Sequence, residues 1–133
     1  MAFDLARGQT VLFGGDDGIS VIQLSDTWIW DGASWTQKFP NTVPFGVSSF
    51  AVAYDASLQA TFIAGGVTTS NGGETSATWA WDGTNWTDKN PAVAPPTPYA
   101  SAAMAYDALR SQMVLFGGVD YSGTVRSWTW VWK

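Results

Sequence analysis

The sequence predicts an all-β fold made of antiparallel sheets, and three observations support this prediction. The 133-residue chain repeats itself with a period of about 50 residues, a length typical of repeated four-stranded units. Short apolar runs rich in β-branched and aromatic residues alternate with turn residues, which favours strands. No long segment carries apolar residues at the three-and-four spacing of an amphipathic helix.

Three landmarks recur in the same order along the chain. The middle copy has Tyr54-Asp55, then Gly65-Gly66, and then an aromatic segment with Trp79, Trp81 and Trp86. The first copy has Phe3-Asp4, Gly14, Gly15, Trp28, Trp30 and Trp35, and the third has Tyr106-Asp107, Gly117, Gly118, Trp130 and Trp132. The repeat divides the chain into units at residues 1–47, 48–100 and 101–133, which together form one domain.

The strands of the middle copy follow from local patterns. Residues 48–54 form one predicted strand and residues 60–64 the next, joined by a turn that Asp55 opens. The equivalent second strands lie at residues 10–13 and 113–116, each ending at a glycine pair.

The aromatic segment predicts a strand that is apolar on both faces. In residues 79–81, alternation places the two indoles on one face and Ala80 on the other. Such a strand belongs in a sheet packed between two neighbouring sheets. Asp82-Gly83 then turns the chain into an outer strand that begins at Trp86.

These landmarks resemble the kelch repeat family, particularly its tryptophan-rich bacterial form. The resemblance implies a β-propeller whose blades each contain four antiparallel strands. The chain would supply about two and three quarter blades, with a truncated first strand in blade 1 and no outer strand in blade 3, whereas propellers have roughly four to eight blades. The resemblance also favours an extracellular or cell-envelope location, although the first residues have no signal-peptide pattern.

An incomplete propeller would expose the apolar faces of its terminal blades and unpaired strand edges. We therefore expect the chain either to associate with copies of itself or to belong to a longer propeller. Two chains would supply about six blades, since repeat units need neighbours to bury their faces. A ring or a filament made of many copies is the structural alternative.

Composition excludes several function classes. The net charge is -5 and the six basic residues are scattered, which argues against nucleic-acid binding. No apolar run is long enough to span a bilayer. The chain has no histidine and no cysteine, which excludes zinc hydrolases, copper oxidases of the galactose-oxidase kind, Ser-His-Asp hydrolases and cysteine proteases. We expect no disulfide, no cofactor, no metal and no catalytic site.

The variable segments between the second and third strands, and those between units, are predicted to emerge on one face. Loops on a rigid scaffold commonly carry recognition residues. The candidate ligand residues on this face are Asp16, Asp17, Asn71, Glu74, Tyr99, Asp120, Tyr121 and Arg126. The predicted function is a non-catalytic binding or protein-interaction scaffold, and the alternative is a glycan-binding or glycan-active propeller.

Three features have a structural interpretation beside the functional one. The tryptophan pairs could stack on sugars, but their fixed place in each repeat favours core positions. Asp16, Asp17 and Asp120 could bind calcium, but they lack the dense oxygen-ligand spacing of a dedicated site, which favours solvated loop charge. The recurring Asp4, Asp55 and Asp107 are expected to cap turns.

Overall fold

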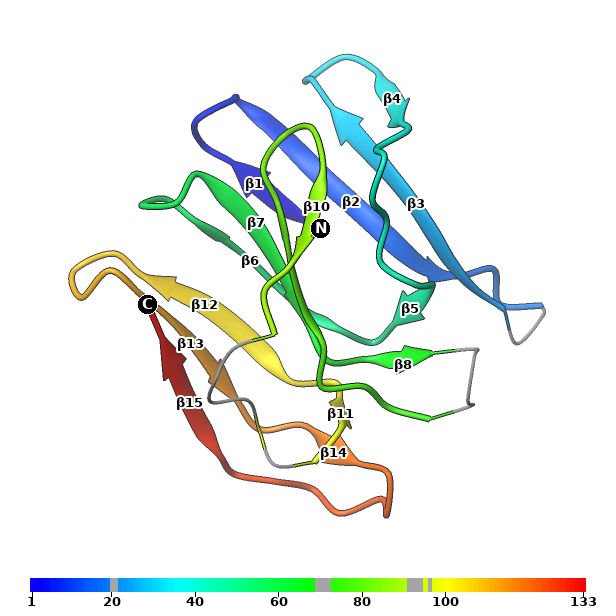
Figure 1. Ribbon diagram of the computed structural model, residues 1–133, viewed down its shortest axis with the longest axis vertical. Coiled ribbons are helices and arrows are strands. Elements are labelled where there is room, and N and C mark those ends of the chain that lie inside the picture. The colour runs from blue at the N-terminus through cyan, green and yellow to red at the C-terminus, as the bar shows by residue number, and fades with distance from the viewer. Residues whose placement is uncertain (20–21, 69–72, 91–94, 96) are drawn as a thin grey trace.

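The computed structural model describes residues 1–19, 22–68, 73–90, 95 and 97–133, and this part of the chain is all-β (Figure 1). The strands pair in antiparallel sheets, and none of the sheets closes on itself in the described residues. The fold class predicted from the repeat is confirmed at this level.

Three larger sheets follow one another along the described chain. The first sheet contains β1 (Ala2–Asp4), β2 (Gln9–Asp16), β3 (Gln23–Trp30) and β4 (Trp35–Lys38), in that order. The second sheet contains β6 (Ala51–Asp55), β7 (Ala60–Ala64), β9 (Thr78–Trp81) and β10 (Trp86–Asp88), also in sequence order. The third sheet contains β12 (Ala103–Asp107), β13 (Gln112–Phe116) and β15 (Thr129–Trp132).

Two short ribbons complete the described strands. They pair β5 (Val47–Ser48) with β8 (Val67–Thr68), and β11 (Tyr99–Ala100) with β14 (Val119–Asp120). The prediction of one strand over residues 48–54 is wrong, because the chain breaks between β5 and β6. Ser49 has a φ of 56°, and Ser101 has a φ of 58° at the equivalent break between β11 and β12. This left-handed backbone lets β5 and β11 leave the larger sheets and pair with β8 and β14.

The recurring aspartates cap the first hairpin turn of each unit. Asp55 Oδ1 accepts hydrogen bonds from the amides of Ser57, at 2.8 Å, and Leu58, at 3.0 Å. Asp107 does the same for Leu109 and Arg110, both at 3.1 Å. The predicted turn-capping role is confirmed.

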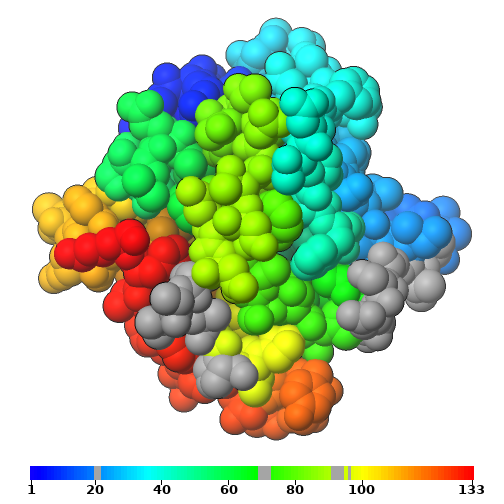
Figure 2. Space-filling view, viewed as in Figure 1, coloured from blue at the N-terminus to red at the C-terminus, as the bar shows by residue number. Residues whose placement is uncertain are grey.

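The second sheet (green) lies between the first (blue and cyan) and the third (orange and red), as Figure 2 shows. The core lies where successive sheets meet. The first sheet contributes Val11, Phe13 and Ile29 to one apolar cluster, and the second contributes Ile63, Trp81 and Trp86. The opposite face of the second sheet places Phe62 and Ala80 against Met113 of the third. Trp81 and Trp86 of the middle unit are therefore core residues, as predicted, and both are buried. The same prediction is wrong for Trp35, which is 42% exposed because no sheet of the described residues covers it.

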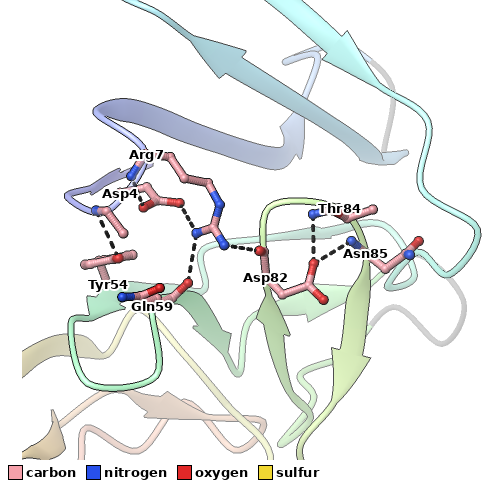
Figure 3. Close-up of polar contacts among 8 residues, drawn as sticks. Asp4, Arg7, Tyr54, Gln59, Asp82, Thr84 and Asn85 are labelled. Atoms are coloured by element: carbon pink, nitrogen blue, oxygen red, sulfur yellow. Dashed lines mark hydrogen bonds and ion pairs between the residues drawn. The ribbon is translucent and has the colours of Figure 1, made fainter.

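Arg7 links the first sheet to the second by polar contacts (Figure 3). Its Nη1 lies 2.8 Å from Asp4 Oδ2 and donates to the Gln59 carbonyl oxygen at 2.9 Å. Its Nη2 donates to the carbonyl oxygen of Asp82, and the amide of the adjacent Ala6 donates to the Tyr54 hydroxyl at 3.2 Å. One guanidinium thus bridges two turns of the neighbouring sheet.

Candidate functional site

The loop end of the molecule lies opposite the turns that the aspartates cap. Figure 1 shows the β2–β3 connection, β8 and β14 gathered at the lower right, whereas the β1–β2, β6–β7 and β12–β13 turns lie at the upper left. The predicted grouping of the variable loops at one end agrees with this arrangement. We call the described residues 15–19, 22–24, 67–68, 73–75 and 119–126 the loop end.

The first loop presents acidic and apolar side chains together. Asp16 and Asp17 are exposed, and their Oδ1 atoms accept hydrogen bonds from the amides of Gly18, at 3.0 Å, and Ile19, at 3.1 Å. The Ile19 side chain is 95% exposed, and Ile22 is exposed beside it in sequence. Ile19 and Ile22 were not among the predicted ligand residues, because apolar residues within a loop follow no strand or helix periodicity.

The second loop is described in part. Asn71 lies outside the described residues. Glu74 is half-buried, and its backbone forms an antiparallel bridge with Val67.

The third loop is organised around Asp120, which is buried. Its Oδ1 accepts hydrogen bonds from the Ser122 amide at 3.0 Å and the Thr124 amide at 3.1 Å, and its Oδ2 accepts one from Arg126 Nε at 2.8 Å. The Arg126 guanidinium also lies 5.3 Å from the Trp128 ring centroid, within range of a cation–π contact. Asp120 therefore stabilises the loop and does not belong to the candidate ligand surface.

The two candidate tyrosines have different surroundings. Tyr99 is 1% exposed, and burial raises the pKa of Tyr99 to about 12. Its assignment to the ligand surface was wrong, because its side chain packs in a buried cluster with Ala51, Ala64 and Leu115. The lack of a side chain at Gly65 leaves room for its ring. Tyr121 is 72% exposed and remains a candidate contact residue.

A small hollow of about 190 Å³ lies on the face of the second sheet that packs toward the third. Its lining consists of Leu58, Ala60, Phe62, Ala80, Asp82, Thr87 and Lys89. The hydrogen bond from the Asn85 amide is the main cause that lowers the pKa of Asp82, so the one acid of this lining is ionised at neutral pH.

Over the described ranges, no group of three or more acidic side chains is arranged to hold a metal ion. None of the described residues forms a helix with the length and apolarity needed to cross a membrane.

Comparison with known proteins shows similarity of fold. No family model matches the chain, and no curated protein does. Among solved structures, the one titled "Structure of YjhT" superposes with a TM-score of 0.69 at 14% identity over 91% of this chain. The chain spans 38% of the length of that protein. At this identity the likeness concerns the fold alone.

The Asp120 contacts predict acid sensitivity of the third loop. The Ser122 hydroxyl and the Arg126 guanidinium hold the pKa of Asp120 well below its usual range. The stabilisation of the folded loop is therefore complete above the unfolded pKa of about 4, and it is lost as the pH falls through the lower folded pKa.

We expect Asp120→Asn to remove this pH dependence and to speed hydrogen exchange at the Thr124 amide at pH 7, because the ion pair with Arg126 is lost. Exchange measured by NMR between pH 7 and pH 2 tests this, with Asp16→Asn as the control at an exposed acid. Unchanged exchange at Thr124 would contradict the role assigned to Asp120.

Proposed function

We propose that this chain is a non-catalytic interaction scaffold built from kelch-like β-propeller blades. Three described sheets pack face to face with matching registers of their central strands. Their variable loops gather at one end. This separation of a packed framework from a loop end is the observation that carries the proposal.

The chemistry of the loop end favours a protein ligand. Exposed apolar side chains, among them Ile19 and Tyr121, lie on loops that also carry the exposed acids Asp16 and Asp17. Apolar contacts surrounded by charge are typical of protein interfaces. We infer a partner surface that combines apolar groups with lysine or arginine.

Glycan binding is the second candidate, and the exposure of Tyr121 supports it, because an accessible aromatic ring can stack on a sugar. Of the two tyrosines expected to contact a sugar, Tyr99 is buried, so Tyr121 alone supports this candidate.

Selection from a displayed random-peptide library, run beside a glycan array, tests the proposal. We expect enriched peptides with basic and apolar residues, whose binding falls at least about ten-fold in Ile19→Ser or Tyr121→Ala, as for loss of one contact residue of a hot spot. Leu58→Ser, an exposed change at the opposite end, is the matched control. Enrichment on the glycan array alone would favour the second candidate, and binding insensitive to both loop variants would contradict use of the loop end.

A further inference from the structure

Two sheet faces are uncovered in the described part of the chain. The first open face is the side of the first sheet that points away from the second, and it carries Phe3, Leu12, Trp28, Trp30 and Trp35. The second open face is the side of the third sheet that points away from the second, and it carries Ala105, Val114, Phe116, Thr129 and Val131.

Equivalent positions within the repeat show what these faces lack. Val131 is 51% exposed, whereas its equivalents Ile29 and Ala80 are each 4% exposed beneath the following sheet. Trp35 is 42% exposed, whereas its equivalent Trp86 is 2% exposed against the preceding sheet. Among the described residues, no sheet covers the outer face of the third sheet or the outer face of the first.

The contact between the first and second sheets shows how such faces pair. Trp86 packs edge-on against Phe13 with ring centroids 4.8 Å apart, and its Nε1 donates to Thr27 Oγ1 at 2.9 Å. Phe13 and Thr27 are cross-strand partners in the first sheet.

The same residue types recur on the open faces. Phe116 and Thr129 are cross-strand partners in the third sheet, at the positions of Phe13 and Thr27. Trp35 lies 5.5 Å from Trp30 at an interplanar angle of 44°, the distance and angle that also relate Trp86 to Trp81. Trp35 is therefore already oriented as Trp86 is, but it has no phenylalanine and threonine to pack on.

Arg110 is the equivalent of Arg7 in the third unit, but it makes no contact with a following sheet in the described residues. Arg110 pairs with Asp107 at 2.8 Å, as Arg7 pairs with Asp4 at the same distance. The Arg110 side chain is 68% exposed, twice the 34% of Arg7, which reaches across to the next sheet.

The acceptor side of this link is also present on the first sheet. The guanidinium of Arg7 lies over Gly83, where a Cβ atom would be 2.7 Å from the Arg7 Cζ. The equivalent Gly32 has a similar φ, 101° against 99°, and has no atom within 4 Å of the same point. The site that would receive an arginine is therefore open.

We propose that the two open faces cover each other between two copies of this chain, which form a closed dimer. Trp35 of one copy packs on Phe116 and donates its Nε1 proton to Thr129 of the other. Arg110 lies over Gly32 and donates to the carbonyl oxygens of Gly8 and Asp31, the equivalents of Gln59 and Asp82. The proposal rests on the blade arrangement proposed above.

A second copy is the occupant that the residues favour, because it supplies both missing partners at once. Each copy offers one face of each kind, so two contacts form by one two-fold rotation and leave neither face uncovered. Arg110 of one copy would donate to backbone carbonyl oxygens of the other copy. The contact therefore needs no acidic side chain from a different protein.

Light scattering coupled to size exclusion over a range of concentrations tests the proposal on the full chain. We expect a dimer whose dissociation constant rises at least about ten-fold in Arg110→Ala, because hydrogen bonds from a charged group are lost. Val131→Asp should abolish the dimer. Both residues are exposed in the single chain, so these variants should remain folded, which circular dichroism checks. Ile19→Asp is the matched control, an exposed apolar residue on the loop end.

A folded monomer at every concentration would overturn the dimer, and so would an open-ended series of larger species or a dimer that both variants leave unchanged. The variant Thr27→Val distinguishes a wrong dimer proposal from a wrong proposal of blade packing. It removes the intramolecular partner of Trp86 and should lower the stability of the chain whether or not a dimer forms, whereas Thr129→Val should weaken the dimer alone. No effect of Thr27→Val would count against the packing of the blades themselves.

Discussion

Replacing Trp81 with alanine is expected to lower the free energy of unfolding by about 3 to 5 kcal/mol, the usual cost of removing a large aromatic side chain from a core. Trp81 is fully buried between the first two sheets, 5.5 Å from the Trp86 ring. The variant would leave a cavity in the apolar cluster that joins the first sheet to the second. Urea denaturation followed by circular dichroism measures the change.

Two further variants test the reason for this effect. Tyr121→Ala removes an exposed ring and should change stability by less than about 0.5 kcal/mol. Trp81→Phe should cost less than Trp81→Ala, because it keeps an aromatic ring and removes an indole Nε1 that is buried without a hydrogen-bond partner. Equal midpoints for Trp81→Ala and Tyr121→Ala would contradict a core role for Trp81.

Replacing Gly65 with alanine is expected to cost about 2 to 5 kcal/mol, from left-handed backbone strain and from overpacking. The residue has a φ of 68°, and an added Cβ atom would lie 2.5 Å from the Tyr99 ring and 2.7 Å from the Tyr99 carbonyl oxygen. The next residue, Gly66, donates its amide proton to that same carbonyl oxygen at 2.7 Å. The variant must therefore displace β11 from the glycine pair.

Gly8→Ala is the matched control for crowding. Gly8 has nearly the same φ, 65°, but no atom lies within 4 Å of the point that an added Cβ atom would occupy. Its cost should be limited to the backbone strain, about 1 to 2 kcal/mol. Thermal and urea denaturation compare the two variants, with near-ultraviolet circular dichroism reporting the surroundings of Tyr99. Equal losses at both glycines would show that crowding against Tyr99 contributes nothing.

Elements that depend on local pattern were predicted well from the sequence. The strand over residues 60–64 forms β7 with the expected bounds, and Asp55 and Asp107 cap their turns. A short apolar run bounded by turn residues is enough to predict a strand, and a capped turn needs only a carboxylate within three residues of the amides that donate to it.

Features that depend on how the chain folds back on itself were not predicted. Tyr99 and Asp120 were assigned to a ligand surface, yet both are buried. Their partners are Gly65, which is distant in sequence, and Arg126, which reaches Asp120 only after the third loop folds back. The break at Ser49 was missed for the same reason, because β5 leaves its strand to pair with β8.

The repeat predicted three units of antiparallel strands, and alternation predicted which side chains of a strand share a face, because alternation and turn chemistry act within a few residues. Only the tertiary structure decided which of those faces are covered. Ala80 and Val131 occupy the same position of the repeat, but the first is buried by the third sheet and the second is half exposed. Burial is a property of the neighbouring surface, and equivalent residues in a tandem array differ whenever their neighbours do.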